Sequence, residues 1–265
     1  MRRWLIQTIA FFAGNNYFQA IINNTGFYQG PLKRFCLPYF TCYSCPLAIA
    51  SCPLGSIQHF FTLQTIPFYV FGFLALIGTG VGRLICGYTC PIGFGQDLLY
   101  RVKTIKFKIP RWTRYVKYAV LASLIIIIPY FTFEPWFCKL CPVGMFQAGI
   151  PLVMWDPPAF DLRPLAGAFY YLKIGIVTAT IIFIITVRRG FCRVFCPLGA
   201  IYSFFNKISI FRIVRTEDCR YCELCIEVCP VEINVFENPN QMECIRCLEC
   251  VRVCKNGGLK FGMKL

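Results

Sequence analysis

Four long apolar runs alternate with polar and basic stretches along the chain. Each run approaches the roughly 20 residues that an α-helix needs to cross the hydrocarbon core of a bilayer. We therefore predict four membrane-spanning helices, at approximately residues 4–22, 60–82, 115–133 and 169–187. No run of this length follows, which predicts an integral membrane domain at 1–215 and a separate domain at 216–265.

The composition supports this interpretation. Hydrophobic residues make up 57% of the 265 residues, and charged residues make up only 15%. Soluble domains are less apolar and carry about 25% charged residues. The chain is therefore expected to contact membrane lipid directly.

The net charge of +15 is unevenly distributed along the chain. Of the 21 basic residues before position 216, 16 are either Arg2 and Arg3 or lie in the segments 83–117 and 188–215. Cytoplasmic loops of membrane proteins carry such an excess of Lys and Arg. We predict a multi-pass protein of the cytoplasmic membrane, with both termini in the cytoplasm and no nucleic-acid partner.

The carboxy-terminal domain contains two copies of one cysteine pattern, CRYCELCIEVC and CIRCLECVRVC. This spacing is typical of bacterial two-cluster ferredoxins, in which the fourth cysteine of each run ligates the other cluster. We predict one [4Fe–4S] cluster on Cys219, Cys222, Cys225 and Cys254, and a second on Cys244, Cys247, Cys250 and Cys229. Zinc knuckles are the alternative, but they use paired cysteines rather than two complete runs of four.

A second motif, C-P-x-G, occurs four times before the ferredoxin runs. The copies are CPLGSIQ from Cys52, CPIGFGQ from Cys90, CPVGMFQ from Cys141 and CPLGAIY from Cys196. Proline is favoured at the first position of a helix, so each cysteine is predicted to be an N-cap. The helix dipole there favours a thiolate and lowers the thiol pKa, which suits a metal ligand.

The order of helices and cysteines predicts a duplicated two-helix unit. The fold class is then mainly α: a four-transmembrane-helix bundle with a carboxy-terminal ferredoxin-like (α+β) domain. Parallel repeats would place two cytoplasmic thiol pairs opposite each other and create an additional [4Fe–4S] site on Cys86, Cys90, Cys192 and Cys196. The alternative is four reduced thiols that pack as small apolar residues or exchange with other thiols.

The cysteines predicted on the outer face allow a further cluster. Its expected ligands are Cys45, Cys52, Cys138 and Cys141, with Cys42 as the alternative to Cys45. A disulfide among Cys36, Cys42 and Cys52 is the competing interpretation if this face meets an oxidising compartment.

These motifs resemble the NapH family, membrane quinol dehydrogenase subunits linked to periplasmic nitrate reductase, and the related NosR and CcoG proteins. RRWLIQ, CGYTCP, CRVFCP and the two ferredoxin runs carry the resemblance, which covers nearly the whole chain. The resemblance implies that Cys86, Cys90, Cys192 and Cys196 are the family's motif cysteines. It also implies that the protein takes part in quinol oxidation. The outer cysteines are more numerous than in the nitrate-reductase accessory protein, which favours a relative serving another anaerobic redox enzyme.

The sequence thus predicts an electron-transfer subunit of an oxidoreductase complex. It would pass electrons between the quinone pool, or an outer-side redox partner, and a partner oxidoreductase. No nucleophile triad or phosphate loop is present in the sequence, so we assign no catalytic residue; the protein would place and tune its cofactors. The alternatives are a maturation or regulatory factor for a metalloenzyme, as in NosR-like or CcoG-like proteins, and a thiol-rich anchor with a working ferredoxin tail.

Overall fold

The computed structural model describes residues 3–22, 27–155, 161–165 and 167–263, and these residues are mainly helical. The first helices are α1 (Arg3–Gly14), α2 (Gln19–Ile22), η1 (Pro31–Arg34), α3 (Pro53–Thr62), α4 (Phe68–Val81), α5 (Leu84–Tyr88) and α6 (Pro91–Leu99). A continuous helix follows, composed of η2 (Arg111–Tyr115), α7 (Val116–Val120), the π-helical η3 (Leu121–Ile127) and α8 (Ile128–Thr132). The remaining helices of this part are α9 (Trp136–Leu140), α10 (Pro142–Gly144), η4 (Met145–Gly149), α11 (Ile150–Trp155), η5 (Arg163–Leu165), α12 (Ala168–Thr186), α13 (Gly190–Val194) and α14 (Pro197–Phe205).

Two helices of the described residues are long and apolar enough to cross a membrane, Arg111–Thr132 and Ala168–Thr186. They match the helices predicted at 115–133 and 169–187. Their side chains are mostly exposed; Phe131, for example, is 73% exposed and Ile182 is 58% exposed. The core helix of a soluble protein would instead be mostly buried, so this exposed apolar surface is consistent with lipid contact.

The other two predicted spans are wrong as continuous helices. The run at 4–22 is interrupted after Gly14, where the Asn15 side chain donates to the Phe11 carbonyl and the chain leaves the helix before α2. Polar Asn side chains compete with the helical backbone in this way.

The run at 60–82 is divided by the loop that ends at Pro67. Proline lacks an N–H donor and disfavours helix in the residue before it. The remaining helix α4 has 14 residues and a length of about 21 Å, less than the hydrocarbon thickness of about 30 Å. Four uninterrupted spans are therefore not present among the described residues.

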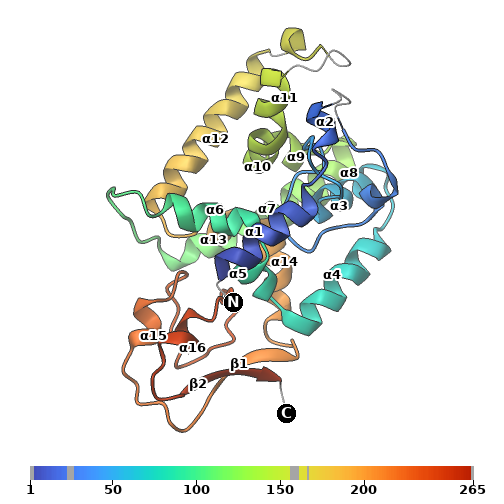
Figure 1. Ribbon diagram of the computed structural model, residues 1–265. Coiled ribbons are helices and arrows are strands. Elements are labelled where there is room, and N and C mark those ends of the chain that lie inside the picture. Colours follow the sequence, from blue (N-terminus) through green and yellow to red (C-terminus); the bar gives the residue numbers. More distant parts are fainter. Residues whose placement is uncertain (1–2, 23–26, 156–160, 166, 264–265) are drawn as a thin grey trace.

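The carboxy-terminal lobe contains β1 (Phe211–Arg215), α15 (Leu224–Glu227), α16 (Glu249–Val253) and β2 (Leu259–Met263). The two strands pair antiparallel, with Phe211 opposite Met263 and Arg215 opposite Leu259. They close the lobe, whose core consists of apolar residues and cysteines. In Figure 1 this lobe lies below the helical part, and the short helices α5, α6 and α13 lie between it and α12.

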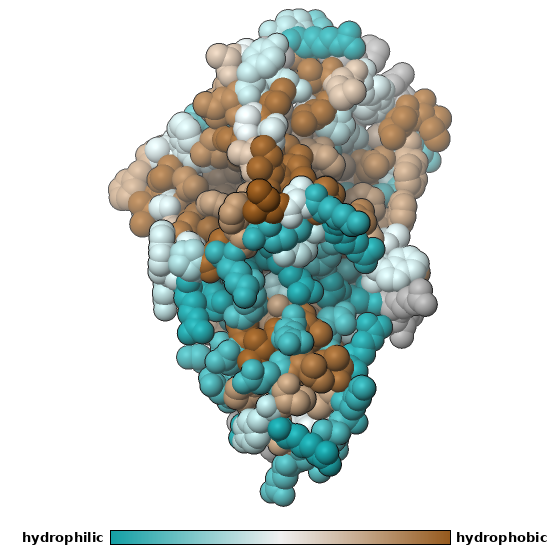
Figure 2. Space-filling model, turned by 90° about the vertical axis from the view of Figure 1, so that its left-hand side faces the viewer, coloured by the Kyte–Doolittle hydropathy of each residue, from teal (hydrophilic) through white to brown (hydrophobic). Residues whose placement is uncertain are grey.

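Polarity follows the same division. Figure 2 shows apolar side chains gathered mainly over the upper half of the face in view and hydrophilic side chains over the lower half. The buried residues form one core in the helical part and one in the lobe, and Cys86 packs against both. The two parts of the molecule therefore meet at a cysteine.

Candidate metal centres

The carboxy-terminal lobe groups its eight cysteines into two sets. The first ferredoxin set lines a pocket of about 170 Å³ and comprises Cys219, Cys222, Cys225 and Cys254. The second ferredoxin set lies in the core of the lobe and comprises Cys229, Cys244, Cys247 and Cys250. The last cysteine of each run thus lies with the other run, an arrangement that two-cluster ferredoxins use.

The loops that carry these sets share an unusual backbone. Tyr221 and Glu223 in the first run have positive φ angles, as do Arg246 and Leu248 at the same positions of the second run. Such angles are uncommon for residues other than glycine and concentrate at functional sites. They turn backbone N–H groups toward the sulfurs; the Arg246 N–H lies 3.4 Å from the Cys244 Sγ. A concavity lined by N–H groups suits an anionic cluster.

The four predicted cytoplasmic cysteines of the helical part lie together, and we call them the inner set. They line a small cavity of about 10 Å³ and are Cys86, Cys90, Cys192 and Cys196. The helix pair α5 and α6 supplies two thiols, and the pair α13 and α14 supplies two from equivalent positions. Separate stretches of sequence thus bring four soft ligands to one place.

Two buried arginines flank the inner set. Arg83 and Arg189 are 1% and 0% exposed, and both act electrostatically on Cys192. Arg189 also donates to the Cys86 carbonyl at 3.0 Å and pairs with Asp97 at 2.6 Å. Buried charges require partners, and an iron–sulfur cluster held by four thiolates is anionic. The charge and ligand chemistry of the inner set therefore fit such a cluster.

Asp97 has a structural place in this arrangement. Its burial raises the pKa of the carboxyl, but the hydrogen bonds and charge of Arg189, with that of Arg3, outweigh burial and hold the pKa below its usual value. The carboxylate therefore stays ionised and fixes Arg189 against α5 and α6.

An outer set lines a pocket of about 240 Å³ at the other end of the helical part. Its members are Cys42, Cys52, Cys138 and Cys141. The prediction had Cys45 in this set and Cys42 as the alternative; in the structure Cys42 lines the pocket, whereas Cys45 does not. Cys45 lies in a local turn in which its carbonyl accepts from the Ala48 N–H at 3.0 Å, and its sulfur lies near the N–H groups of Leu47 and Ala48. No disulfide joins any of the eighteen cysteines in this structure.

The predicted N-cap positions are confirmed, but the predicted pKa effect is wrong. Cys52, Cys90, Cys141 and Cys196 each precede a helix that starts with proline. The Gly199 N–H approaches the Cys196 Sγ at 3.4 Å, which lowers the thiol pKa, but burial has the larger effect. Burial raises the pKa of Cys90 to about 12 and that of Cys52 to about 11. Free thiolates are therefore disfavoured, and iron would supply the missing positive charge.

The seventh residue of the C-P-x-G motif has a function that the sequence alone did not reveal. Gln58 accepts from the Cys138 N–H at 3.1 Å, and Gln147 accepts from the Cys42 N–H at 2.8 Å. At the inner set, Gln96 accepts from the Cys192 N–H at 3.4 Å and donates to the Cys192 Sγ at 2.9 Å. Each glutamine thus reaches from one half of a site to a cysteine of the other half.

The fourth motif has Tyr202 instead, and its hydroxyl donates to the Pro38 carbonyl at 2.9 Å. The recurring glutamine was the signal from which these contacts could have been inferred.

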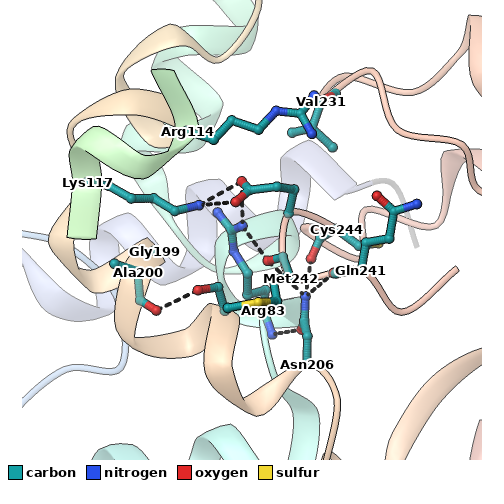
Figure 3. A network of polar contacts seen from close by, with 12 residues as sticks. Arg83, Arg114, Lys117, Gly199, Ala200, Asn206, Val231, Gln241, Met242 and Cys244 are labelled. Atoms are coloured by element: carbon teal, nitrogen blue, oxygen red, sulfur yellow. Dashed lines mark hydrogen bonds and ion pairs between the residues drawn. The ribbon is translucent and has the colours of Figure 1, made fainter. Parts of the chain in front are cut away.

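The second ferredoxin set is fixed against the inner set by the polar network in Figure 3. Asn206 donates to the Gln241 and Cys244 carbonyls at 3.1 and 2.7 Å. Lys117 contacts both Glu243 carboxylate oxygens at 2.6 Å, and Arg83 donates to the Met242 carbonyl at 2.9 Å. The network therefore holds the segment that leads into Cys244.

Gly87 shows how close the two sets are. A Cβ at this position would lie 2.5 Å from the Ile245 carbonyl oxygen and 3.2 Å from the Cys247 backbone. In the sequence, Gly87 directly follows Cys86 and comes shortly before Cys90. The backbone of the inner set is therefore in direct contact with that of the second ferredoxin set.

Among the described residues, no three or more His, Cys, Asp or Glu side chains are arranged to hold a single metal ion.

A separate apolar cavity of about 430 Å³ lies between α1, α6, η4 and α12. Its polar lining is confined to a few groups, among them Gln96 and Gln147. These two glutamines also contact the inner and outer sets. The cavity is therefore adjacent to both.

Comparison with known proteins adds independent information. Residues 205–264 match the family model of a 4Fe–4S dicluster domain. Residues 62–111, 118–152 and 171–215 match a 4Fe–4S binding domain, so that family match extends over the inner set and part of the outer set.

An uncharacterised protein of Methanocaldococcus jannaschii is 34% identical over 68% of this chain and 72% of its own length. The ferredoxin-type protein NapH of Escherichia coli is 25% identical, and the alignment covers 65% of this chain and 59% of NapH. The chain belongs to the NapH-like family of ferredoxin-type 4Fe–4S proteins.

Another member, the putative electron transport protein YccM of Escherichia coli, is 27% identical over 65% of this chain. The alignment spans 48% of YccM, so this chain matches about half of that relative. Iron–sulfur electron transfer is the activity that these relatives support for the family. No solved structure matches the chain.

Proposed function

We propose that this protein is a membrane-bound electron-transfer subunit that holds a [4Fe–4S] cluster at each of the four cysteine sets. The observation that carries the proposal is the contact at Gly87, where the inner set meets the second ferredoxin set. Clusters at these positions would follow one another through the molecule. The family matches over both parts of the chain support cluster binding in both.

The clusters would supply one-electron chemistry, and the chain's own residues would bind and tune them. Arg83 and Arg189 compensate negative charge at the inner set. Gln96 orients Cys192 from the other half of the site and donates to its sulfur. Such contacts set the potentials of iron–sulfur centres.

The proposed series of clusters would be accessible to redox partners at both of its ends. The pocket of the outer set is the larger one, and Cys222 in the first ferredoxin set is exposed. We assign the outer pocket to the outer face of a cytoplasmic membrane and the ferredoxin lobe to the cytoplasm. The positive-inside pattern and the two long apolar helices support this orientation. Redox partner subunits would contact one or both ends.

The apolar cavity is our proposed quinone site. Ligand pockets of about 300–1,000 Å³ are mostly apolar with a few polar groups that orient the ligand, and this cavity has about 430 Å³. Gln96 and Gln147 line it and can hydrogen-bond the quinone oxygens. Oxidation of a quinol there would release two electrons and two protons, and the electrons would pass singly to the adjacent centres.

A pocket-filling variant tests the quinone site. Gly95 lines the cavity and has open space beside it, so Gly95→Trp would occupy the cavity. In detergent micelles, a menaquinol analogue should reduce the clusters of the wild type and lose this ability in Gly95→Trp. Gly72→Trp is the matched control, because Gly72 also faces open space but does not line the cavity.

Reduction that is equally fast in Gly95→Trp would contradict the quinone site, and the cavity would then hold lipid. If quinones leave the cluster spectra of the wild type unchanged while an apo-metalloenzyme gains metal, the maturation function is correct instead.

A further inference from the structure

One short segment passes between the inner and outer sets. The Phe40 backbone N–H lies close to the Cys90 sulfur of the inner set. The backbone N–H of the next residue, Thr41, lies close to the Cys52 sulfur of the outer set. The residue after that is Cys42, a member of the outer set. Two consecutive peptide groups therefore lie beside sulfurs of the inner and the outer set.

The Phe40 side chain makes a second connection. Its ring is stacked on that of Phe191, with centroids 6.0 Å apart and ring planes within 4°. The Phe137 ring is also close to it, with centroids 6.2 Å apart and a tilted arrangement. Phe191 directly precedes Cys192 of the inner set, and Phe137 directly precedes Cys138 of the outer set. The three rings thus connect the two halves of the molecule beside the peptide link.

This connection is buried. Phe40 and Phe191 are each 3% exposed, and Phe137 is 6% exposed. Phe40 also lines both the inner cavity and the outer pocket. Because water is excluded, the charge of an electron passing here would cause little solvent rearrangement. Phe40 is thus a buried neighbour of both sets, and a path through it would need no diffusible carrier.

We infer that the segment Phe40–Cys42, together with the rings of Phe191 and Phe137, is a direct electron path between the outer and inner sets. The inference rests on the proposed function, because it requires clusters at both sets. One electron leaves a reduced centre at the outer set and is taken up by an oxidised centre at the inner set, with no bond made or broken. The contact at Gly87 continues the path to the second ferredoxin set. The chain alone would then conduct electrons across the membrane, with a quinone acting as a donor and not as the link.

Proteoliposomes made without quinone test this inference. Ferricyanide enclosed in the vesicles is the oxidant, dithionite added outside is the reductant, and potassium with valinomycin compensates the charge that crosses. We expect ferricyanide to be reduced to ferrocyanide at a rate proportional to the amount of incorporated protein. Transfer that occurs only after a menaquinone analogue is added would overturn the direct path.

Iron and sulfide content and the EPR spectra of the same sample separate this failure from failure of the proposed function. With all clusters present, reduction of both centres should give spectra broadened by magnetic coupling between the inner and outer sets. Absence of this coupling in a sample that contains both clusters would contradict the path. Absence of the clusters themselves would contradict the proposed function.

The Phe40→Leu variant tests the ring. It keeps the peptide link and an apolar side chain, so iron content should match the wild type while the quinone-free rate falls severalfold. Phe73→Leu is the control, because Phe73 stacks on Tyr69 in α4 and lines neither site. Equal rates in both variants would exclude the ring from the path, and the wild-type measurement would still test the peptide link.

Discussion

The inner and outer sets use the same motif but differ in their surroundings. The inner set encloses about 10 Å³, lies between two buried arginines and is covered by the ferredoxin lobe. The outer set borders about 240 Å³ of space, and the basic groups that line it are Lys139 and Lys173. In both, a C-P-x-G cysteine caps a helix from each half of the site.

Under the proposed function, this difference would give one ligand design two different functions. The enclosed inner set beside its two arginines would relay electrons inside the protein, and the open outer set would exchange them with a partner. Positive charge and hydrogen bonds to sulfur stabilise the reduced, more negative form of a cluster. We therefore expect the inner centre to have the higher reduction potential, which favours electron flow from the outer to the inner set.

The largest effect should follow loss of two inner ligands. In the Cys90→Ser/Cys196→Ser variant we expect one cluster's share of iron to disappear and electron transfer across quinone-free vesicles to stop. Iron analysis and vesicle kinetics measure both effects. The control is Cys36→Ser/Cys45→Ser, because these two cysteines line neither the inner cavity nor the outer pocket. Full iron content in the inner variant would show that the inner thiols bind no cluster.

The outer set is tested by two neighbouring single variants. Cys42→Ser should lose iron and the signal of the outer centre, because Cys42 lines the pocket. Cys45→Ser should keep both, because Cys45 does not line the pocket. EPR spectroscopy and iron analysis of the two proteins distinguish the assignments. Loss of iron in Cys45→Ser but not in Cys42→Ser would show that Cys45, and not Cys42, is the ligand of the outer cluster.

Glu243 is one of the residues that hold the lobe against the helical part. In Glu243→Gln, the fully buried Lys117 ammonium loses its counter-charge, since it contacts both Glu243 oxygens. Removing one partner of a buried ion pair costs about 3–5 kcal/mol. Because Glu243 keeps a side-chain exposure of 12%, we expect the lower end of this range, measured as free energy of unfolding in detergent.

The same carboxylate predicts a pH dependence. Burial raises the pKa of Glu243, but the charges of Arg83 and Lys117 lower it more, so the folded pKa lies below the usual 4.5. Its contribution to stability is therefore complete above about pH 4.5 and is lost as the pH falls through the folded value. The free energy of unfolding of Glu243→Gln should lack this loss at low pH. A variant with unchanged stability and the same acid dependence would contradict the assignment.

The smallest expected effect concerns Gln96. Gln96→Leu removes an N–H donor from the Cys192 sulfur and should lower the potential of the inner centre. A hydrogen bond of about 1 kcal/mol corresponds to a shift of about 40 mV for a one-electron couple. Redox titration followed by EPR measures it. Gln147→Leu is the matched control, because Gln147 contacts the Cys42 N–H at the outer set. If Gln147→Leu shifted the potential of the inner centre equally, the lost hydrogen bond to Cys192 would not be the cause.

Local sequence patterns predicted the parts of this structure that depend on local chemistry. Proline after cysteine correctly indicated the four helix N-caps, and hydrophobic length indicated the helices at 111–132 and 168–186. Hydrophobic length failed where one polar or cyclic residue changed the backbone, at Asn15 and at Pro67. Ligation by the cysteine sets stays a prediction.

Long-range contacts were not predictable in this way. The choice of Cys42 over Cys45 depends on the turn at Leu47 and Ala48 and on the distant Gln147. The N-cap pKa prediction failed because burial, which is a property of the whole fold, outweighs the local N–H groups. Contact between Gly87 and Cys247 likewise arises only when the lobe has docked.

Under the proposed function, the helical part holds clusters of its own at the inner and outer sets. Iron and sulfide analysis of the anaerobically purified protein, combined with Mössbauer spectroscopy, measures whether these clusters are present. We predict iron and sulfide for four [4Fe–4S] clusters per chain. Iron and sulfide for the two ferredoxin clusters alone, with the inner and outer cysteines all reactive toward a thiol reagent after unfolding, would contradict it.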